Sequence, residues 1–579
     1  MNTLVIVLIA AVVLFGAYMV YGRWLAKKWG IDPKAETPAV NYNDGKDFVP
    51  TNGWTVFSHQ FSSIAGAGPV TGAIQAAAFG WLPVLLWILI GGVFFGAVTD
   101  FGALYASVKN EGKSMGMIIE KYIGKFGRKI FLLFCWLFTL IVIAAFADMV
   151  AGTFNAYTVN ADGATVLSAA AKTNGSAGMV SIMFMVFAVV FGLIQKKWNL
   201  SGWKEAVVGI IFIIASFVIG NYFPIELGKN AWSYITFVYI FFAAVMPMWL
   251  MKQPRDYMTT FMFICMIVGA AVGLVVAHPS MNLPVYTGFN NAKLGTMFPI
   301  LFVTVACGAV SGFHSLVSSG TSSKTVENEK DMLKVGYGAM VLESLLAVLA
   351  LCVAGAAATN GALPAKTPFA IFSSGVAGFF EMFGVPVHFA TVFMTMCVSA
   401  LALTSLDAVA RIGRMSFQEL FSVDDMEHAE GWRKLLCNTY FSTIVTLVCG
   451  FILTKIGYAN IWPLFGSANQ LLSALVILTL CVFLKVTGRS NKMLFPPLII
   501  MLCVTFTALV QRTIAMVKAI KLAASVTIPA GQTSWGSVFI ANGLQLIIAI
   551  LLIVLGVIIV VNSVKSYAKS EKNSEKTAA

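Results

Sequence analysis

Long apolar stretches follow one another along almost the whole chain, separated by short polar segments. A membrane-spanning α-helix needs about 20 predominantly apolar residues, and about fifteen stretches are close to this length. They lie at residues 2–21, 56–79, 83–107, 129–155, 179–195, 205–222, 231–251, 257–277, 297–318, 336–358, 386–410, 437–456, 461–485, 494–514 and 537–562. A shorter stretch at 368–383 contains Glu381 and is predicted to be re-entrant or interfacial. The pattern predicts an all-α polytopic membrane protein with about fifteen transmembrane helices.

Two of these stretches contain runs of small and polar residues in their middle. The first run is SSIAGAGPVTG at 62–72, and the second is CGAVSGFHSLVSSG at 307–320. Every backbone polar group in hydrocarbon needs a partner, so a helix that unwinds there must have something to bind. Two such breaks in corresponding places of two half-chains are typical of a secondary transporter's substrate site. Close helix packing at small residues is the alternative for the first run.

Composition and charge agree with a membrane protein. The 579 residues are 59% hydrophobic and 11% charged, whereas soluble domains contain about 25% charged residues. The net charge of +13 comes from basic residues in alternate loops, which indicates orientation in the membrane rather than nucleic-acid binding. Arg23 follows the first helix, so we expect an uncleaved anchor with its N-terminus outside and a cytoplasmic C-terminus. A loop with Arg512, Lys518 and Lys521 does not fit, because the alternation places it outside.

This orientation makes the two broken segments run in opposite directions, which predicts a 5+5 inverted repeat with extra helices. The expected units are an anchor helix with a cytoplasmic entry loop, a first core repeat, two intervening helices, a second core repeat, two C-terminal helices and a basic tail. Their boundaries are 1–53, 54–228, 229–295, 296–490, 491–565 and 566–579.

The first break suits a carboxylate. Pro69 lacks a backbone donor, and the half-helix that follows it presents free N–H groups at its positive end. The candidate substrate-binding residues of the two breaks are Ser62, Ser63, Gly66, Gly68, Pro69, Thr71, Ser311, Gly312, His314 and Ser318. The chain has neither a dinucleotide fingerprint nor a Walker A motif, which argues against ATP-driven transport.

Ionisable residues inside apolar stretches are functional candidates, because a charge at membrane depth is costly. His59 and His314 lie beside the breaks and can relay protons, or they are simply hydrogen-bonded to neighbouring helices. Asp407 either pairs with Arg411 one turn away or forms a cation or proton site with Thr404 and Ser405 against freed carbonyls of the first break. The candidate ion-coupling residues are Thr404, Ser405, Asp407, Asp100, Glu343 and His59.

Other polar segments have simpler expected roles. The adjacent amides Asn469 and Gln470 are predicted to form helix–helix hydrogen bonds. Residues 253–257 (QPRDY) are predicted to form a cytoplasmic turn, and 44–52 a polar entry loop that is either a connector or part of an inner gate. The nine cysteines have no metal-ligand spacing, and no HExxH or GxSxG motif is present. An enzyme is therefore not expected.

Several strings resemble the carbon starvation protein A family over about residues 1–565. They are DGKDFVPTN (44–52), HQFSSIAGAGPVTG (59–72), LWILIGGVFFGAVTDF (86–101), FADMVAGTF (146–154), QPRDY (253–257), CGAVSGFHSLVSSGTSSK (307–324), LTSLDAVARIGR (403–414) and WPLFGSANQLL (462–472). The resemblance implies a bacterial inner-membrane transporter of the leucine-transporter type, active in peptide uptake during nutrient limitation or in pyruvate uptake. It also implies a possible sodium site at Thr404 and Ser405.

Together these features predict a secondary active importer of peptides or small carboxylates such as pyruvate, coupled to a proton or sodium gradient. The alternative is a membrane nutrient receptor that binds the same ligands without accumulating them. The expected partners are a small-molecule substrate and the lipid bilayer, with no nucleic acid and no cofactor besides the coupling ion. The sequence leaves the coupling ion and the oligomeric state open. If Asp407 couples the ion, Asp407→Asn abolishes gradient-driven accumulation but leaves exchange intact.

Overall fold

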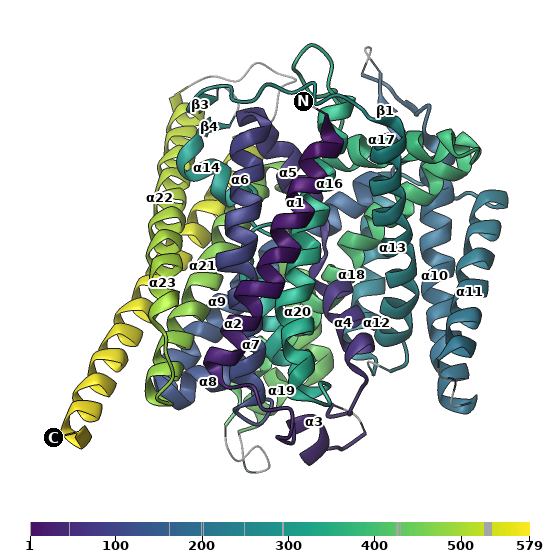
Figure 1. Cartoon of the computed structure of the whole chain (residues 1–579). Helices are drawn as coiled ribbons and strands as arrows, with labels where there is room; N and C mark the ends of the chain where they lie inside the picture. Colours follow the sequence, from purple (N-terminus) through teal and green to yellow (C-terminus); the bar gives the residue numbers. More distant parts are fainter. Residues whose placement is uncertain are drawn as a thin grey trace.

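Helices make up nearly all of the described chain, which confirms the predicted all-α class (Figure 1). The computed structural model describes residues 2–578 except 46, 161–162, 199, 201, 248, 292–293, 424–427, 429 and 526–534. Two small antiparallel hairpins accompany the helices. They pair β1 (Tyr157–Val159) with β2 (Thr165–Leu167), and β3 (Asn290–Asn291) with β4 (Gly295–Thr296).

The first half of the chain contains the first broken segment. Its helices are α1 (Thr3–Ala17), α2 (Arg23–Trp29), α3 (Pro38–Asn41), α4 (Gly53–Ile64), α5 (Ala67–Ala76), α6 (Trp81–Gly91), α7 (Ala97–Val108), α8 (Met115–Tyr122), α9 (Lys125–Thr153), α10 (Ala171–Trp198), α11 (Trp203–Tyr222), α12 (Lys229–Val245) and α13 (Lys252–Ala277). Short 3₁₀ or π turns lie at Tyr18–Gly22, Ala77–Phe79 and Gly92–Gly96.

The second half contains the second broken segment. Its helices are α14 (Met297–Thr304), α15 (Gly312–Gly320), α16 (Ala339–Ala357), α17 (Pro368–Met382), α18 (Val387–Phe421), α19 (Gly431–Cys437), α20 (Thr439–Thr454), α21 (Tyr458–Val486), α22 (Phe495–Ser525) and α23 (Trp535–Ala578). Short 3₁₀ or π turns lie at Ser322–Lys324, Glu329–Asp331, Leu333–Gly338 and Lys492–Leu494.

Eleven helices of the described chain are long and apolar enough to cross a membrane, or 12 if the bent pair of α19 and α20 is one span. The remaining predicted stretches correspond to α12, which has 17 residues, and to the two broken segments. The count of about fifteen spans therefore stays a prediction. The stretch predicted as re-entrant or interfacial is α17, a helix of 15 residues. Arg512, Lys518 and Lys521 lie within α22, so the loop predicted for them is wrong.

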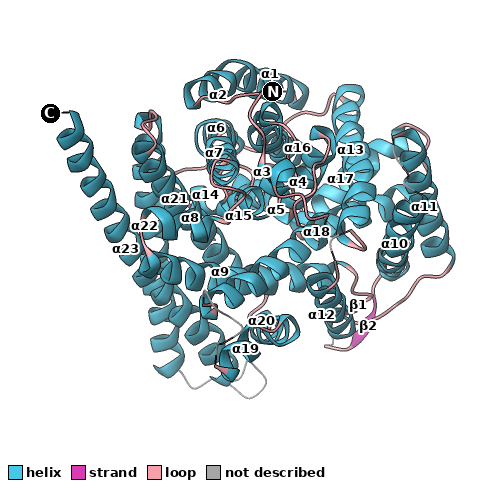
Figure 2. Ribbon diagram, turned by 90° about the horizontal axis from the view of Figure 1, so that it is seen from below, coloured by secondary structure: helices cyan, strands magenta, loops and turns pink. Residues whose placement is uncertain are grey.

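The broken segments lie at the centre of the helix bundle. α4, α5, α15, α16 and α18 are grouped in the middle, while α10 and α11 lie at one side and α22 and α23 at the other (Figure 2). α5 packs on α16, α4 on α13, and α15 on α7 and α21. Residues 60–74 are buried throughout, so the breaks are enclosed by other helices.

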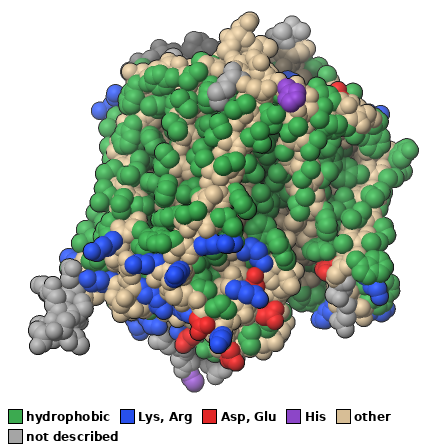
Figure 3. Space-filling view, in the orientation of Figure 1, with side chains coloured by type: hydrophobic (Ala, Val, Ile, Leu, Met, Phe, Trp, Pro, Cys, Tyr) green, Lys and Arg blue, Asp and Glu red, His purple; other side chains and the backbone are tan. Residues whose placement is uncertain are grey.

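The two ends of the bundle differ in charge. On the face drawn in Figure 3, a wide hydrophobic belt lies above an end where Lys and Arg side chains gather. This end, which carries α3, α8 and α19, is called the basic end below (Figure 1). The opposite end carries α17 and the β-hairpins, and the chain begins there. The exposed apolar side chains of α1, such as Leu8, Val12 and Phe15, are typical of a lipid-facing helix.

Candidate functional site

The first helix break lies at residues 65–66, between α4 and α5. Pro69 is tolerated in the first turn of α5, because N–H groups there have no intrahelical partner anyway. Gly66 and Gly68 allow very close contacts. A Cβ at Gly66 would overlap the Ser405 hydroxyl of α18, and one at Gly68 would overlap the Cys307 side chain. The break is therefore held against α18 on one side and against the second break on the other.

The second break covers residues 305–311, between α14 and α15. Asn469 of α21 stabilises the start of α15. Its Oδ1 accepts hydrogen bonds from the Phe313 backbone N–H at 3.0 Å and the Ser311 hydroxyl at 3.2 Å. Gln470 donates to the Phe302 carbonyl at 2.7 Å. The helix–helix hydrogen bonds predicted for these two amides are confirmed, and both serve the broken segment.

Ser405 reaches the first break, as the sequence predicts. Its hydroxyl donates to the Ser63 carbonyl at 3.2 Å, in the last turn of α4. The neighbouring Thr404 hydroxyl donates instead to the Ala400 carbonyl of its own helix at 2.9 Å. Ser405 therefore contacts a carbonyl of the broken helix, and Thr404 points back along α18.

Asp407 pairs with residues of α12 and α13, which the sequence does not suggest. Its Oδ2 accepts hydrogen bonds from the Tyr239 hydroxyl at 2.5 Å and from the Arg255 guanidinium. Arg411 donates instead to the backbone carbonyls of Ala243 and Met246, at 2.9 and 2.7 Å. The predicted alternative of an Asp407–Arg411 ion pair is wrong, because the α12–α13 hairpin packs against α18 and supplies both sets of partners.

A second charged cluster joins α13 to α4. Lys252 donates to Asp256 at 2.8 Å and to the Ser63 hydroxyl at 3.1 Å. His59 Nδ1 lies 3.0 Å from the same Asp256 carboxylate. The Ser62 hydroxyl lies 2.7 Å from that of Thr260. These contacts tie the half of α4 nearest the break to the start of α13.

The predicted cytoplasmic turn at residues 253–257 is therefore wrong. α13 begins at Lys252, and Lys252, Arg255 and Asp256 are all buried within its first turns. Charged residues at the end of an apolar stretch resemble a loop. The signal that could have identified them is their i, i+3, i+4 spacing, which puts the three side chains on one helix face.

A third cluster is fully buried on the second break. His314 of α15 lies between Asp100 of α7 and Glu343 of α16. The distances are 3.1 Å from Nδ1 to Asp100 Oδ2 and 3.3 Å from Nε2 to Glu343 Oε2, the second without hydrogen-bond geometry. All three side chains are 0% exposed. Two carboxylates beside one imidazole, away from water, are stabilised when the cluster keeps at least one proton.

The sequence singles out each of these three residues, but nothing in their spacing joins them. They lie on three helices whose contact depends on how α15 enters between α7 and α16. Ser318, one turn after His314, accepts a hydrogen bond from Gln60 of α4 at 2.8 Å. The two broken segments are thus connected by side chains as well as by Gly68 and Cys307.

Cavities lie on both sides of the breaks. One of about 420 Å³ opens towards the opposite end and is lined by Thr71, Asp148, Lys229 and Tyr458 among others. Asp148 pairs there with Lys229 at 2.7 Å. A second of about 990 Å³ lies at the same end beside α14 and α22.

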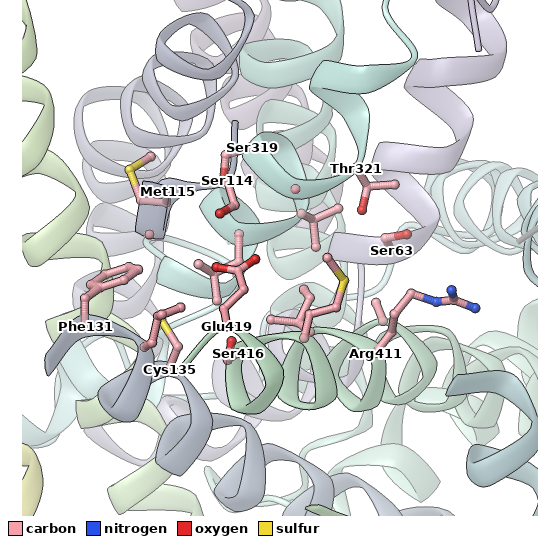
Figure 4. A pocket seen from close by; sticks show the side chains of 18 of the residues that line it. Ser63, Ser114, Met115, Phe131, Cys135, Ser319, Thr321, Arg411, Ser416 and Glu419 are labelled. Atoms are coloured by element: carbon pink, nitrogen blue, oxygen red, sulfur yellow. The ribbon is translucent and has the colours of Figure 1, made fainter. Parts of the chain in front are cut away.

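One cavity towards the basic end, called the narrow cavity below, measures about 60 Å³ and has room for a few waters. Figure 4 shows Ser63, Thr321, Arg411 and Glu419 around it. Another of about 180 Å³, lined by His59 among others, lies at the same end. Both of these cavities at the basic end are smaller than the two cavities at the opposite end.

Known proteins match this chain along its length. Peptide transporter CstA of Escherichia coli (strain K12) is 30% identical over 572 residues, covering 85% of this chain and 78% of that protein. Peptide transporter CstA of Bacillus subtilis (strain 168) is 30% identical over 630 residues, covering 99% and 98%. Pyruvate/proton symporter BtsT of Escherichia coli is 37% identical over 370 residues, covering 61% of this chain and 49% of that protein.

Among solved structures, MhsT in complex with L-phenylalanine covers 88% of this chain and 99% of its own, at 10% identity and a TM-score of 0.47. A family model described as carbon starvation protein CstA matches residues 2–363 and 355–508. Its matches include both helix breaks and all three charged clusters. The chain therefore belongs to the carbon starvation protein CstA family.

Proposed function

We propose that this protein is a secondary active importer of peptides or small carboxylates such as pyruvate, in the inner membrane of a bacterium and in the response to carbon starvation. Its relatives are named as peptide transporters and as a pyruvate/proton symporter. In the proposed orientation the basic end faces the cytoplasm, which agrees with the gathering of Lys and Arg there (Figure 3).

The observation that carries this proposal is the direct contact of two broken helices at the centre of the bundle. A Cβ at Gly68 would overlap Cys307, and one at Gly72 would lie 2.5 Å from the Thr304 carbonyl. The first turn of α5 offers its N–H groups near this contact, and Thr71 in the next turn lines the 420 Å³ cavity. A substrate carboxylate entering from that cavity would bind these N–H groups. Ser311, Gly312 and Ser318 of the second break complete the proposed pocket.

The proposed transport cycle opens the basic end and closes the opposite end. In the structure, α4 is tied to the second broken segment by Gln60, which donates to Ser318 at 2.8 Å and accepts from Ser322 at 2.5 Å. The Thr51 backbone N–H also donates to the Thr325 carbonyl at 3.0 Å, so the entry loop forms part of the same closed region. In a 5+5 inverted repeat, rocking of one bundle against the other would break these bonds and widen the narrow cavity.

The coupling ion in this proposal is a proton held by Asp100, His314 and Glu343. His314 of this cluster lies on α15 itself, so a change in the protonation of the cluster would alter the packing of a broken helix directly. Because the cluster is completely buried, each net charge there costs free energy. This favours the binding of one proton together with one negatively charged substrate. Sodium at Ser405 and Thr404 is the competing assignment.

Purified protein in liposomes tests the proposal. Uptake of a labelled dipeptide and of labelled pyruvate is measured under an inward proton gradient, then under an inward sodium gradient. Accumulation of either substrate above its external concentration under the proton gradient is expected. Accumulation only under the sodium gradient moves the ion site to Ser405. Saturable binding without accumulation under both gradients overturns the transporter proposal and favours the nutrient receptor.

A further inference from the structure

The side chain of Lys252 occupies the region where the sequence suggests a sodium ion. This side chain is 5% exposed, and its ammonium group donates to the Ser63 hydroxyl at 3.1 Å. The carbonyl of the same Ser63 accepts the Ser405 hydroxyl at 3.2 Å. Both oxygens of Ser63 are thus bound, one by a cation from α13 and one by α18.

The end of α4 is a place that attracts positive charge. Its last carbonyls lie at the negative end of the helix dipole, and the break at residues 65–66 prevents α5 from continuing the hydrogen-bond ladder. In transporters with broken helices, such carbonyl ends bind the coupling cation. Here Lys252, anchored by its partner Asp256 at 2.8 Å, supplies the positive charge from within the chain.

The charged neighbours of Lys252 come from three helices. On its own helix, Asp256 pairs with it, and Arg255 is directed to Asp407. From α4, His59 lies 3.0 Å from Asp256. From α18, Asp407 forms an ion pair with Arg255 and accepts a hydrogen bond from Tyr239. Arg411, also of α18, lines the same narrow cavity as Lys252. These paired charges make a sodium ion next to Lys252 unfavourable, because it would add a cation without a further anion.

We propose that Lys252 is a built-in cation that takes the place of sodium at the end of α4 and makes transport independent of sodium. The inference rests on the proposed transport function. It deepens that proposal by saying which side chain stands where a coupling sodium ion would bind. Lys252 acts through α4 as a positioning residue, holding the broken helix against α13 and α18.

Lys252 and Ser63 both line the narrow cavity (Figure 4 labels Ser63), so a small cation that enters this cavity would lie beside them. This allows chemical rescue. In Lys252→Ala, the shortened side chain leaves space for a free cation beside Ser63. Lys252→Met keeps most of the volume but removes the charge, and Lys252→Arg keeps the charge. The exposed Lys197 of α10 provides the control Lys197→Ala.

The experiment measures dipeptide and pyruvate uptake into liposomes under a fixed proton gradient, with and without sodium, ammonium or methylammonium. Wild-type protein and Lys197→Ala are expected to transport equally well without sodium, and Lys252→Arg should keep more of that rate than Lys252→Ala. Lys252→Ala should lose about tenfold or more of its initial rate, as expected for removal of one partner of a buried ion pair. Added sodium or ammonium should restore part of that rate, whereas Lys252→Met should stay inactive with every cation.

Two results overturn the inference. One is sodium stimulation of the wild-type protein, which needs no variant and therefore does not depend on whether Lys252→Ala folds. The other is normal sodium-free uptake by Lys252→Ala or Lys252→Met. Both results require a wild-type protein that transports. Absence of any wild-type accumulation contradicts the proposed function instead.

Discussion

The imidazole of His314 lies 3.1 Å from the carboxylate of Asp100, and both side chains are fully buried. This contact joins α15, which follows the second break, to α7. Glu343 completes the cluster from α16 at 3.3 Å. Within the described part of the chain, both Glu343 oxygens lack a hydrogen-bond partner. An unpartnered buried carboxylate is a suitable place for a proton that is bound and released during transport.

Glu343→Gln should therefore separate coupling from substrate movement. The amide keeps the size of the side chain but cannot take up or release a proton. We expect proton-driven accumulation to fall about tenfold or more, a loss typical of a missing proton-transfer group, while counterflow exchange of labelled for unlabelled substrate continues. Glu381→Gln changes an exposed residue of α17 and should leave both activities unchanged. Normal accumulation by Glu343→Gln would remove this cluster from the coupling mechanism.

The contact between Gly66 and Ser405 gives a prediction with a built-in rescue. A methyl group at Gly66 would overlap the Ser405 hydroxyl, while the Ser405 Cβ lies 3.2 Å away. Gly66→Ala should destabilise the protein by about 1–3 kcal/mol, the usual cost of overpacking, and should slow uptake. The double variant Gly66→Ala with Ser405→Ala removes the overlapping hydroxyl and should recover most of the thermal stability measured in detergent.

Gly152→Ala is the matched control for this pair. Gly152 lies in α9 with no other atom within 4 Å of its added Cβ, so the change should be neutral. Equal stability of Gly66→Ala and the double variant would show that Ser405 is not what restricts position 66.

The sequence predicts the places where helices break better than it predicts what the breaks contact. Gly66 and Pro69 lie within an apolar stretch, and the structure breaks at residues 65–66, just before Pro69, which lies in the first turn of α5. Ser405 lies against the first break, where the resemblance to transporters of the leucine-transporter type places it; the periodicity of its own helix does not show which helix it contacts. The partners of Asp407 are not predictable in this way, since Arg255 and Tyr239 reach it through the packing of a hairpin that lies far away in sequence.

The helix count shows a similar limit. Apolar length identifies helices such as α9 and α21 with nearly correct bounds, because continuous hydrophobicity at membrane depth is required for spanning. It also extends past the C-terminal end of α12 and stops before the end of α22, where polar residues continue the helix. The predicted stretch at 257–277 begins after the real start of α13 at Lys252. A helix start that is rich in charged residues resembles a loop.

Asp407→Asn tests whether this carboxylate couples an ion or balances a charge. Its carboxylate pairs with Arg255 and Tyr239, so the amide would leave the guanidinium buried without a counter-charge. We expect a loss of about 3–5 kcal/mol in stability, the usual effect of breaking a buried pair. The double variant Arg255→Met with Asp407→Leu removes both charges and should recover much of that stability, measured by thermal unfolding.

Transport by the same variants decides between the two roles. If Asp407 balances the charge of Arg255, the stabilised double variant should keep proton-driven accumulation. If it couples the ion, Asp407→Asn and the double variant should both lose accumulation while exchange continues. Loss of accumulation in a stable double variant would therefore move the proton site from Glu343 to Asp407.

Asn469 provides a test of the second break that does not involve charge. Its side chain accepts from the Phe313 backbone N–H and donates to the Ser311 hydroxyl at 2.9 Å. Asn469→Ala removes the group that caps α15 and should cost about 1–2 kcal/mol in stability, as for other lost helix caps. Because the Ser311 hydroxyl becomes free to turn, the apparent KM for substrate should rise more than the maximal rate falls. Asn460→Ala removes an amide near the start of the same α21 that donates to the Ile456 carbonyl just before the helix, and should leave KM unchanged. An unchanged KM in Asn469→Ala would mean that the start of α15 does not form part of the substrate pocket.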